Sequence, residues 1–328
     1  MALDADRRAQ LEQARAVALL KQCFDVDASA TAGTAPFGVT VTAGDRAWVV
    51  SMSDDLAALG GVLVWLDRHA PAEAHLVLDH HAEVHARRAA VLAPELRVWK
   101  AVGDTVVEAE AEPVPPALPR PDDTAHLEAL LVDEGLEVVC EDGLLRGELA
   151  GLEVARILHG PDGPVLEAGV GRFDREAGVL LHAGRSVAES LHDAVTQVRP
   201  HRTPGAVSHA VNRLARERWL RHVIVGEPGL VGVDFPELVE PIPPRANLLD
   251  VVPASLIAHD GDQRVLVVCS VGVDLGLVPA VADLVAVHAP DEIRLVLPER
   301  DRLPYIERLA ERLPVPVSFR SIDAPWVD

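Results

Sequence analysis

Two stretches of the sequence repeat one another at a displacement of 219 residues. The letters DL at 55–56 recur at 274–275, HAP at 69–71 recur at 288–290, and LVL at 76–78 recur at 295–297. Internal repetition at a fixed displacement is the signature of duplicated structural units. Any fold for this chain therefore has to contain the same small unit twice.

Each repeat predicts the same order of secondary structure. A strand pair turns at residues 43–45 in the first copy and at 260–262 in the second, where a glycine next to an aspartate favours a tight hairpin turn. A helix, an apolar strand, a second helix and a last strand follow in both copies. The predicted fold class is α/β, with two related small ββαβαβ units, of which 246–328 repeats 37–100.

Two proline-rich joints separate the repeats from a middle segment. The joints hold Pro113, Pro115, Pro116, Pro119 and Pro121, and then Pro236, Pro241, Pro243 and Pro244. Because proline removes backbone donors and favours extended chain, these joints predict domain boundaries. We expect an N-terminal α/β unit with a leading helix at 1–112, a middle domain at 122–235 and a C-terminal α/β unit at 246–328.

The middle domain is predicted to be α+β with an antiparallel sheet, flanked by the two units. We expect a helix at 123–134, short strands over 137–149, 152–159 and 164–170, and helices at 185–198 and 206–223. Strands followed by helices are typical of helices that cover one face of such a sheet. If 160–163 is a four-residue turn, Arg156 lies opposite Glu167 across the hairpin.

Composition restricts the partners of this chain. It has 51 acidic and 30 basic side chains, and a formal net charge of -21 repels phosphate backbones, so nucleic acid is not the expected partner. The three cysteines lack CxxC spacing, and the N-terminus lacks the basic start and apolar core of an export signal. These features predict a cytoplasmic protein with no membrane association.

The clearest charge feature is the arginine-rich segment 199–222, which holds six arginines and one acid, Glu217. A stripe of Val207, Val211 and Leu214 predicts the buried side of a helix. Three basic residues then lie on another face: His209, Arg213 and Arg216. Such a face suits an acidic protein or a phosphate-bearing ligand. The alternative is internal docking on the twelve acids of 108–148.

Carboxylates of the middle domain are the candidate catalytic groups, namely Glu148, Glu153, Glu167 and Asp174. Carboxylates bind metal ions and act as general acids and bases, so this set points to a divergent metal-dependent hydrolase or nuclease-like enzyme. For Glu167 the cross-strand pair with Arg156 is a sufficient alternative.

Histidines near the end of the first repeat are weaker candidates for a metal site. His81 and His85 stand one helical turn apart, so both imidazoles can reach one ion, with Asp79 or His80 as a third ligand. The matching stretch of the second repeat, 299–302, reads ERDR, which is typical of a solvated surface. The alternative is therefore a wet helix surface.

Asp55 and Asp274 occupy matching positions, where a strand ends and a helix begins. Ligands of α/β proteins bind at such places, so the pair predicts a small-ligand sensor if the two ends face each other across a pocket. Helix capping is the alternative, since aspartate accepts hydrogen bonds from the free amides of a first turn. Cys269, near the same strand end, is either a nucleophile or a buried structural thiol.

The order hairpin, helix, strand, helix, strand resembles the core of the restriction-endonuclease-like fold. Nucleases of that group carry an acid-x-lysine pair on the second hairpin strand. This chain instead reads AWVVS at 47–51 and VLVVC at 265–269. The resemblance therefore implies two inactive copies that bind no catalytic metal in that way.

The first functional hypothesis is a non-enzymatic cytoplasmic binding or assembly protein that contacts an acidic or phosphate-bearing partner. It follows by elimination, because the sequence shows no nucleotide loop, metal quartet or triad signature, and a fold alone assigns no activity. The hydrolase that uses the middle-domain carboxylates is the alternative. The sequence identifies no cofactor and no oligomeric state.

Overall fold

The computed structural model describes residues 5–26, 30–161, 163–171, 186–242, 248 and 251–327. Over these residues the chain is a mixed α/β protein with three β-sheets, as its sequence predicts. The chain divides into two compact units. The first is formed from Met1–Val114, Asp274–Ala286 and Leu303–Pro314, and the second from Pro115–Val273, Val287–Arg302 and Val315–Asp328. The division into three domains stays a prediction.

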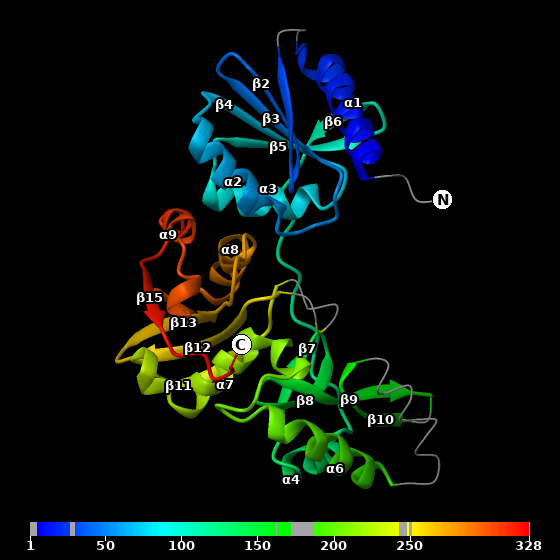
Figure 1. The fold of residues 1–328 in the computed structure, drawn as a ribbon, viewed down its shortest axis with the longest axis vertical. Helices are drawn as coiled ribbons and strands as arrows, with labels where there is room; N and C mark the ends of the chain where they lie inside the picture. The colour runs from blue at the N-terminus through cyan, green and yellow to red at the C-terminus, as the bar shows by residue number, and fades with distance from the viewer. Residues whose placement is uncertain are drawn as a thin grey trace. The chain divides into compact units, whose positions relative to one another are not determined.

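The first unit is built on a six-stranded sheet in the order β1-β2-β3-β4-β5-β6 (Figure 1). Its strands are β1 (Thr31–Ala35), β2 (Gly38–Ala43), β3 (Arg46–Ser51), β4 (Glu73–Leu78), β5 (Leu96–Val102) and β6 (Thr105–Glu108). Its helices are α1 (Ala5–Phe24), α2 (Ala58–His69), α3 (Ala82–Leu92), α8 (Leu277–His288) and α9 (Pro304–Ala310). The three central strands run parallel, and the outer ones pair antiparallel.

Different helices cover the two faces of the six-stranded sheet. α1 packs Leu19 and Leu20 into a core with Val41, Trp48 and Val77 on one face. Right-handed crossovers between parallel strands place α2 and α3 together on the other face, which is the arrangement seen in Figure 1. Along each strand, successive side chains therefore point alternately toward α1 and toward α2 and α3.

A close backbone approach joins α8 to α2 inside the first unit. A Cβ atom on Gly60 would lie 1.7 Å from the carbonyl oxygen of Leu275, and one on Gly276 would lie 3.0 Å from the Cβ of Ala57. A larger residue at position 60 would push the two backbones apart. The beginnings of the two matching helices therefore touch one another directly.

Asp283 of α8 is the centre of a buried ion triad with α3. The Nε of Arg88 lies 2.8 Å from one carboxylate oxygen, and the Nε of Arg87 lies 2.9 Å from the other. Arg88 and Asp283 expose 2% and 1% of their side chains. An unpaired charge at this depth is strongly unfavourable, so the triad holds α3 and α8 together.

The second unit contains a four-stranded sheet that is antiparallel throughout, in the order β10-β9-β8-β7. Its strands are β7 (Glu137–Glu141), β8 (Leu144–Leu149), β9 (Leu152–Gly160) and β10 (Gly163–Ala168). Leucines and valines of α4 (Ala125–Asp133) and α6 (Val187–Val198) share its core, including Leu131 and Leu191. The predicted hairpin register is confirmed, because Glu167 pairs with Arg156 and Pro164 with His159.

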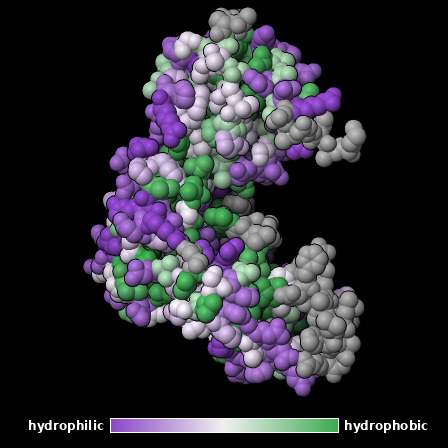
Figure 2. Space-filling view, viewed as in Figure 1, coloured by the Kyte–Doolittle hydropathy of each residue, from purple (hydrophilic) through white to green (hydrophobic). Residues whose placement is uncertain are grey.

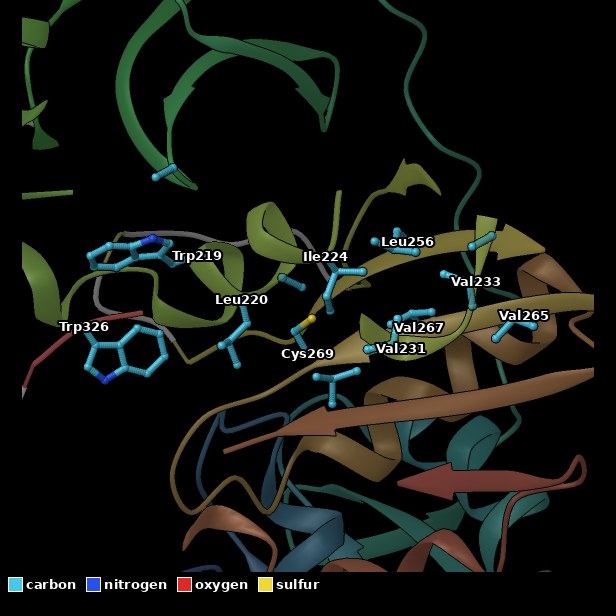
Figure 3. Packing of buried hydrophobic residues seen from close by; sticks show 14 residues of the cluster. Trp219, Leu220, Ile224, Val231, Val233, Leu256, Val265, Val267, Cys269 and Trp326 are labelled. Carbon is cyan, nitrogen blue, oxygen red and sulfur yellow. The ribbon is translucent and has the colours of Figure 1, made fainter. Parts of the chain in front are cut away.

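The second unit also contains a five-stranded sheet in the order β11-β12-β13-β14-β15. Its strands are β11 (Asp234–Val239), β12 (Ala254–Asp260), β13 (Gln263–Cys269), β14 (Glu292–Leu297) and β15 (Val317–Ser321). Figure 3 shows how Trp219, Leu220 and Ile224 of α7 (Arg216–Gly226) lie with Val267 and Cys269 of β13 in one core. α7 therefore packs on this sheet.

The two larger sheets share strand order and register. Arg46 pairs with Glu73 in the first sheet, and Val265 pairs with Glu292 in the other, each residue displaced by 219. α2 and α8 have the same displacement, and both end before an alanine at φ 44°, Ala70 or Ala289. In each sheet, a helix and an antiparallel edge strand precede the repeated strands. They are α1 and β1 in the six-stranded sheet, and α7 and β11 in the five-stranded sheet.

The predicted helix at 206–223 is wrong in its first half. Val207, placed in the buried stripe, exposes 85% of its surface, and α7 begins only at Arg216. The reason is Arg202, whose buried guanidinium donates to the carbonyls of Leu214 and Ala215 at 3.0 and 3.3 Å. Ala215 also adopts a left-handed φ of 47°, which interrupts helical geometry.

The surface mixes polar and apolar side chains. On the face drawn in Figure 2, hydrophobic residues lie among hydrophilic ones. The most exposed large apolar residues include Val207 and Phe235, at 85% and 82%. Within the described ranges, no helix combines the length and the apolar character needed to cross a lipid bilayer.

Candidate functional site

The predicted catalytic carboxylates Glu148 and Glu153 lie directly opposite each other on β8 and β9. Glu148 is completely buried and accepts hydrogen bonds from Arg218 and from Arg221, the latter at 3.1 Å. Glu153 pairs with Arg146. Arginines therefore balance the charge of both carboxylates.

A third carboxylate, Glu141, completes this buried network. It lies 2.6 Å from Arg218 and 3.6 Å from Arg146. Burial by itself lowers the pKa of Arg218, but Glu148 and Glu141 raise that pKa above its ordinary value. Three guanidinium groups thus meet three carboxylates, so the arrangement ties α7 to the four-stranded sheet.

The predicted catalytic carboxylate Glu167 has a partner outside this network. Glu167 pairs with Arg156 at 3.0 Å, and both side chains are 27% exposed, which is the cross-strand alternative. Asp174 lies outside the described residues. Over the described ranges, no three His, Cys, Asp or Glu side chains form a group that could hold a metal ion. The hydrolase hypothesis stays a prediction.

Most contacts of the arginine-rich segment 199–222 are made with other residues of the second unit. Arg218 and Arg221 bind Glu148, and His222 pairs with Glu137, so these residues dock on the acidic stretch as the internal alternative requires. Arg202 stacks its guanidinium 4.1 Å from the ring centre of Trp219. The segment therefore contributes to the interior of the protein.

The three predicted contact residues of this segment differ in their surroundings. Arg216 lies 4.9 Å from the ring centre of Trp326 and donates to the carbonyl of Asn212. His209 is exposed and stacks on His201 at 3.8 Å. Arg213 is exposed to solvent. A partner at His209, Arg213 and Arg216 stays a prediction.

Asp55 and Asp274 have the same local role in the two repeats. Asp55 accepts the amide hydrogen of Ala57, and Asp274 accepts that of Gly276, both at 2.8 Å. Ala57 and Gly276 directly precede α2 and α8, so both bonds close local turns at the beginnings of the helices. Neither bond reaches an amide of the first helical turn, as the capping alternative requires. Since Gly276 and Ala57 are in contact, packed backbone lies between the two helix beginnings. A ligand at these aspartates stays a prediction.

The structure does not bring His81, His85 and Asp79 together as metal ligands. Asp79 accepts hydrogen bonds from Arg15 at 2.8 and 3.3 Å. His85 is 1% exposed, so it does not lie on a wet helix surface either. Cys269 is likewise fully buried, and burial raises its pKa to about 12, as the structural-thiol alternative predicts.

His85 predicts a specific acid sensitivity. Burial, helped by the charges of Arg88 and His81 against those of Asp283 and the backbone of Asp55, lowers its pKa from 6.5 to about 4. The unfolded chain therefore binds a proton below pH 6.5, whereas the folded chain does so only near pH 4. Stability falls as the pH drops through this window, by about 3 kcal/mol from this residue.

Urea unfolding at several pH values between 4 and 7 measures this loss. We expect the free energy of unfolding to depend less steeply on pH in the His85→Gln variant than in the wild type. This holds even if the two proteins differ in stability at pH 7. The carboxylates titrate in both proteins, so their contribution to the pH dependence cancels in the comparison. Parallel profiles would show that His85 titrates alike in the folded and unfolded states.

The first unit contains a pocket that the sequence did not reveal. It has a volume of about 370 Å³ and lies on the α1 face, where β3, β4 and β5 begin. Its lining residues are Cys23, Phe24, Arg46, Glu73, His75, Arg97, Trp99, Thr105 and Val106. The last residues of α1 and the turn into β6 bring aromatic rings next to charged side chains there.

A chain of hydrogen bonds orders the floor of this pocket. The indole N–H of Trp99 can only donate, so Nδ1 of His75, 3.1 Å away, is the acceptor. The neutral ring then carries its proton on Nε2, which lies 3.3 Å from Glu73. Burial, with the charges of Arg97 and Arg46 against Glu73, lowers the pKa of His75. His75 is therefore uncharged at neutral pH, and it stacks on Trp48 at 5.4 Å.

The pocket carries an excess of positive charge. Arg97 lies 3.7 Å from Glu73 and compensates it. Arg46 is half-buried with its guanidinium carbon 5.0 Å from the ring centre of Trp48, and within the described part of the chain it forms no ion pair. With His75 neutral, the described lining residues leave one positive charge without a counter-ion.

The matching place in the second unit is filled by a side chain. Arg294 occupies the position of His75, and Glu292 that of Glu73, at the displacement of 219. Arg294 is 3% exposed, bonds Glu292 at 2.9 Å and donates to the carbonyl of Val231 at 2.8 Å. Val265 replaces Arg46. At this position the first repeat therefore has a histidine that lines the pocket, and the second has a buried arginine that binds Glu292.

One compositional signal could have pointed to this site. Only 3% of residues are Phe, Trp or Tyr, yet Phe24, Trp48 and Trp99 surround a single histidine. These residues are separated by 24 or more positions, and the strand register together with the packing of α1 brings them together. No protein-family model, curated protein or solved structure matches the chain significantly, so its function is inferred from the geometry of this pocket.

Proposed function

We propose that the protein is a non-enzymatic binding protein whose ligand is a small anionic molecule held in the pocket of the first unit. The observation that carries this proposal is Arg46, a half-buried cation without an ion-pair partner in the described residues, at a pocket of about 370 Å³. Pockets of this size accept small organic molecules, and a few placed polar groups orient them. This partner differs from the acidic protein or phosphate-bearing ligand that the sequence suggests for His209, Arg213 and Arg216, and its contact is Arg46.

The hydrogen bonds of the pocket favour binding over catalysis. Both ring nitrogens of His75 are engaged, one by Trp99 and one by Glu73. The carboxylate of Glu73 also faces Arg97. A general base needs an acceptor that can reach the proton of a substrate, and these acceptors already have donors. The network is suited to holding a rigid binding surface.

The topology of the repeats also supports a non-enzymatic role. The order hairpin, helix, strand, helix, strand occurs over β2–β5 and β12–β15, as in the endonuclease-like resemblance. Residues 47–51 and 265–269 hold no acid-x-lysine pair, so we propose that both repeats are degenerate copies without cleavage activity. The three cysteines are free thiols, which fits the cytoplasmic location that we propose.

Alkylation of Cys23 tests whether the pocket binds an anion. Cys23 lines the pocket, so an occupied pocket restricts access of iodoacetamide to its sulfur. We expect at least one anion of a panel of aromatic carboxylates and aryl phosphates to slow alkylation of Cys23 severalfold. Peptide mass spectrometry after timed labelling measures the rate at each thiol separately.

Cys140 provides the control within the same molecule. It is half-buried in the second unit, and burial raises its pKa, so it reacts slowly but measurably. Its rate should be the same with and without the anions. Equal slowing of both cysteines, or no slowing of Cys23 at millimolar concentrations of any anion, would contradict the proposed function.

A further inference from the structure

We infer that the ligand of the first-unit pocket is a monocarboxylate with an apolar body. This inference rests on the proposed function and narrows its anionic ligand to one chemical class. Three features carry it: the geometry of Arg46, the carboxylate of Glu73 beside the second arginine, and the aromatic wall.

Arg46 supplies the contact for the carboxylate. It is the first residue of β3, and its guanidinium is held over the face of Trp48 at 5.0 Å. A guanidinium that stacks on an aromatic ring keeps the N–H groups of its edge available. These donors form a planar fork that matches the two oxygens of a carboxylate.

Glu73 limits the charge of the ligand to one negative unit. Arg97 is the second cation of the pocket, but its charge is balanced by Glu73 at 3.7 Å. A phosphate monoester carries about -1.5 to -2 charges at neutral pH. The second negative charge of the phosphate would find no unbalanced cation in the pocket, because Glu73 lies beside Arg97. The carboxylate of Glu73 would repel that charge, and like charges in an interface reduce affinity. A carboxylate avoids this repulsion.

The wall of the pocket requires an apolar body on the ligand. Phe24 stands edge-on to Trp99, with ring centres 5.2 Å apart and planes at 84°. Val106 and Cys23 continue this surface. A bare carboxylate would fill a small part of about 370 Å³ and leave these groups against water. A flat ring system covers them and gains affinity.

Calorimetric titration of the full chain with three probes tests the inference. The probes are 2-naphthoate, 2-naphthyl phosphate, which has the same ring with a second charge, and acetate, which has the carboxylate without the ring. We expect 2-naphthoate to bind about tenfold more tightly than 2-naphthyl phosphate. We expect acetate to bind at least tenfold more weakly than 2-naphthoate.

Two variants separate the roles of the charged groups. Arg46→Gln should weaken 2-naphthoate at least tenfold. Glu73→Gln keeps an acceptor for His75 and removes the repelling charge, so it should erase the preference for 2-naphthoate over 2-naphthyl phosphate. Arg68→Gln, which removes an exposed arginine of the same unit outside the pocket, is the matched control and should leave all three affinities unchanged.

The possible outcomes distinguish this inference from the proposed function. Tighter binding of 2-naphthyl phosphate by the wild type would overturn the monocarboxylate and leave anion binding intact. Equal affinity for acetate and 2-naphthoate would overturn the apolar body. If no probe binds and no anion protects Cys23, the proposed function fails together with the inference.

Discussion

The substitution Asp283→Ala is expected to destabilise the first unit by about 3–5 kcal/mol, because it removes the buried carboxylate that Arg87 and Arg88 both bind. Arg88, 2% exposed, loses the carboxylate 2.8 Å from its Nε, and Arg87 loses the partner of its own Nε. Arg88 keeps its bond to the carbonyl of Leu56, which does not balance the charge. Hydrogen exchange of the α3 amides measures the loss in this unit.

Asp67 offers the matched control for Asp283. It pairs with Arg312 at 2.6 Å, but the two side chains are 25% and 28% exposed. Asp67→Ala should therefore cost less than about 1 kcal/mol. Joint replacement of Arg88 by methionine and Asp283 by leucine should regain much of the stability, since apolar pairs can substitute for buried ion pairs. Similar losses for Asp67→Ala and Asp283→Ala would refute the role of burial.

The substitution Glu148→Ala is expected to have a comparable effect in the second unit, again about 3–5 kcal/mol. Glu148 is completely buried between Arg218 and Arg221, which are themselves 4% and 2% exposed. Without it, Arg221 loses its carboxylate and Arg218 keeps only Glu141. Hydrogen exchange over β8 and α7 measures the change.

Glu167→Ala is the control for Glu148, because Glu167 and Arg156 form a pair in which each side chain is 27% exposed. We expect a loss below about 1 kcal/mol. The two variants also bear on the hydrolase hypothesis. If Glu148→Ala leaves stability unchanged, its burial among arginines is not structural, and a chemical role for this carboxylate becomes the better explanation.

The repeat made much of the fold predictable from the sequence. A hairpin turn, an apolar strand and an amphipathic helix are local patterns, and a second copy shows which of them recur. α2 and α8 accordingly have the same length and the same displacement. The beginning of α7 was not predictable, because the carbonyls of Leu214 and Ala215 bind a guanidinium from Arg202, twelve or more residues away in the chain.

The pocket could not be predicted because strand register and the packing of α1 on the sheet bring its residues together. Trp48 pairs with His75, and His75 pairs with Arg97, across neighbouring strands. Spacing along the chain does not encode that register. Burial of arginine was equally hidden: Arg218 and Arg221 have the spacing of a solvated helix face, and only their pairing with Glu148 explains why they lie inside.

The discontinuous make-up of the first unit has a consequence for its synthesis. Gly60 packs on Leu275 and Arg88 binds Asp283, so α2 and α3 find their partners only after α8 has been translated. α9, the other late segment, ends at Ala310. At about 5–20 residues per second, the ribosome needs roughly 10–40 s to make the stretch between Val114 and this segment. During that time the nascent N-terminal third of the chain exposes the faces of α2 and α3 that α8 later covers.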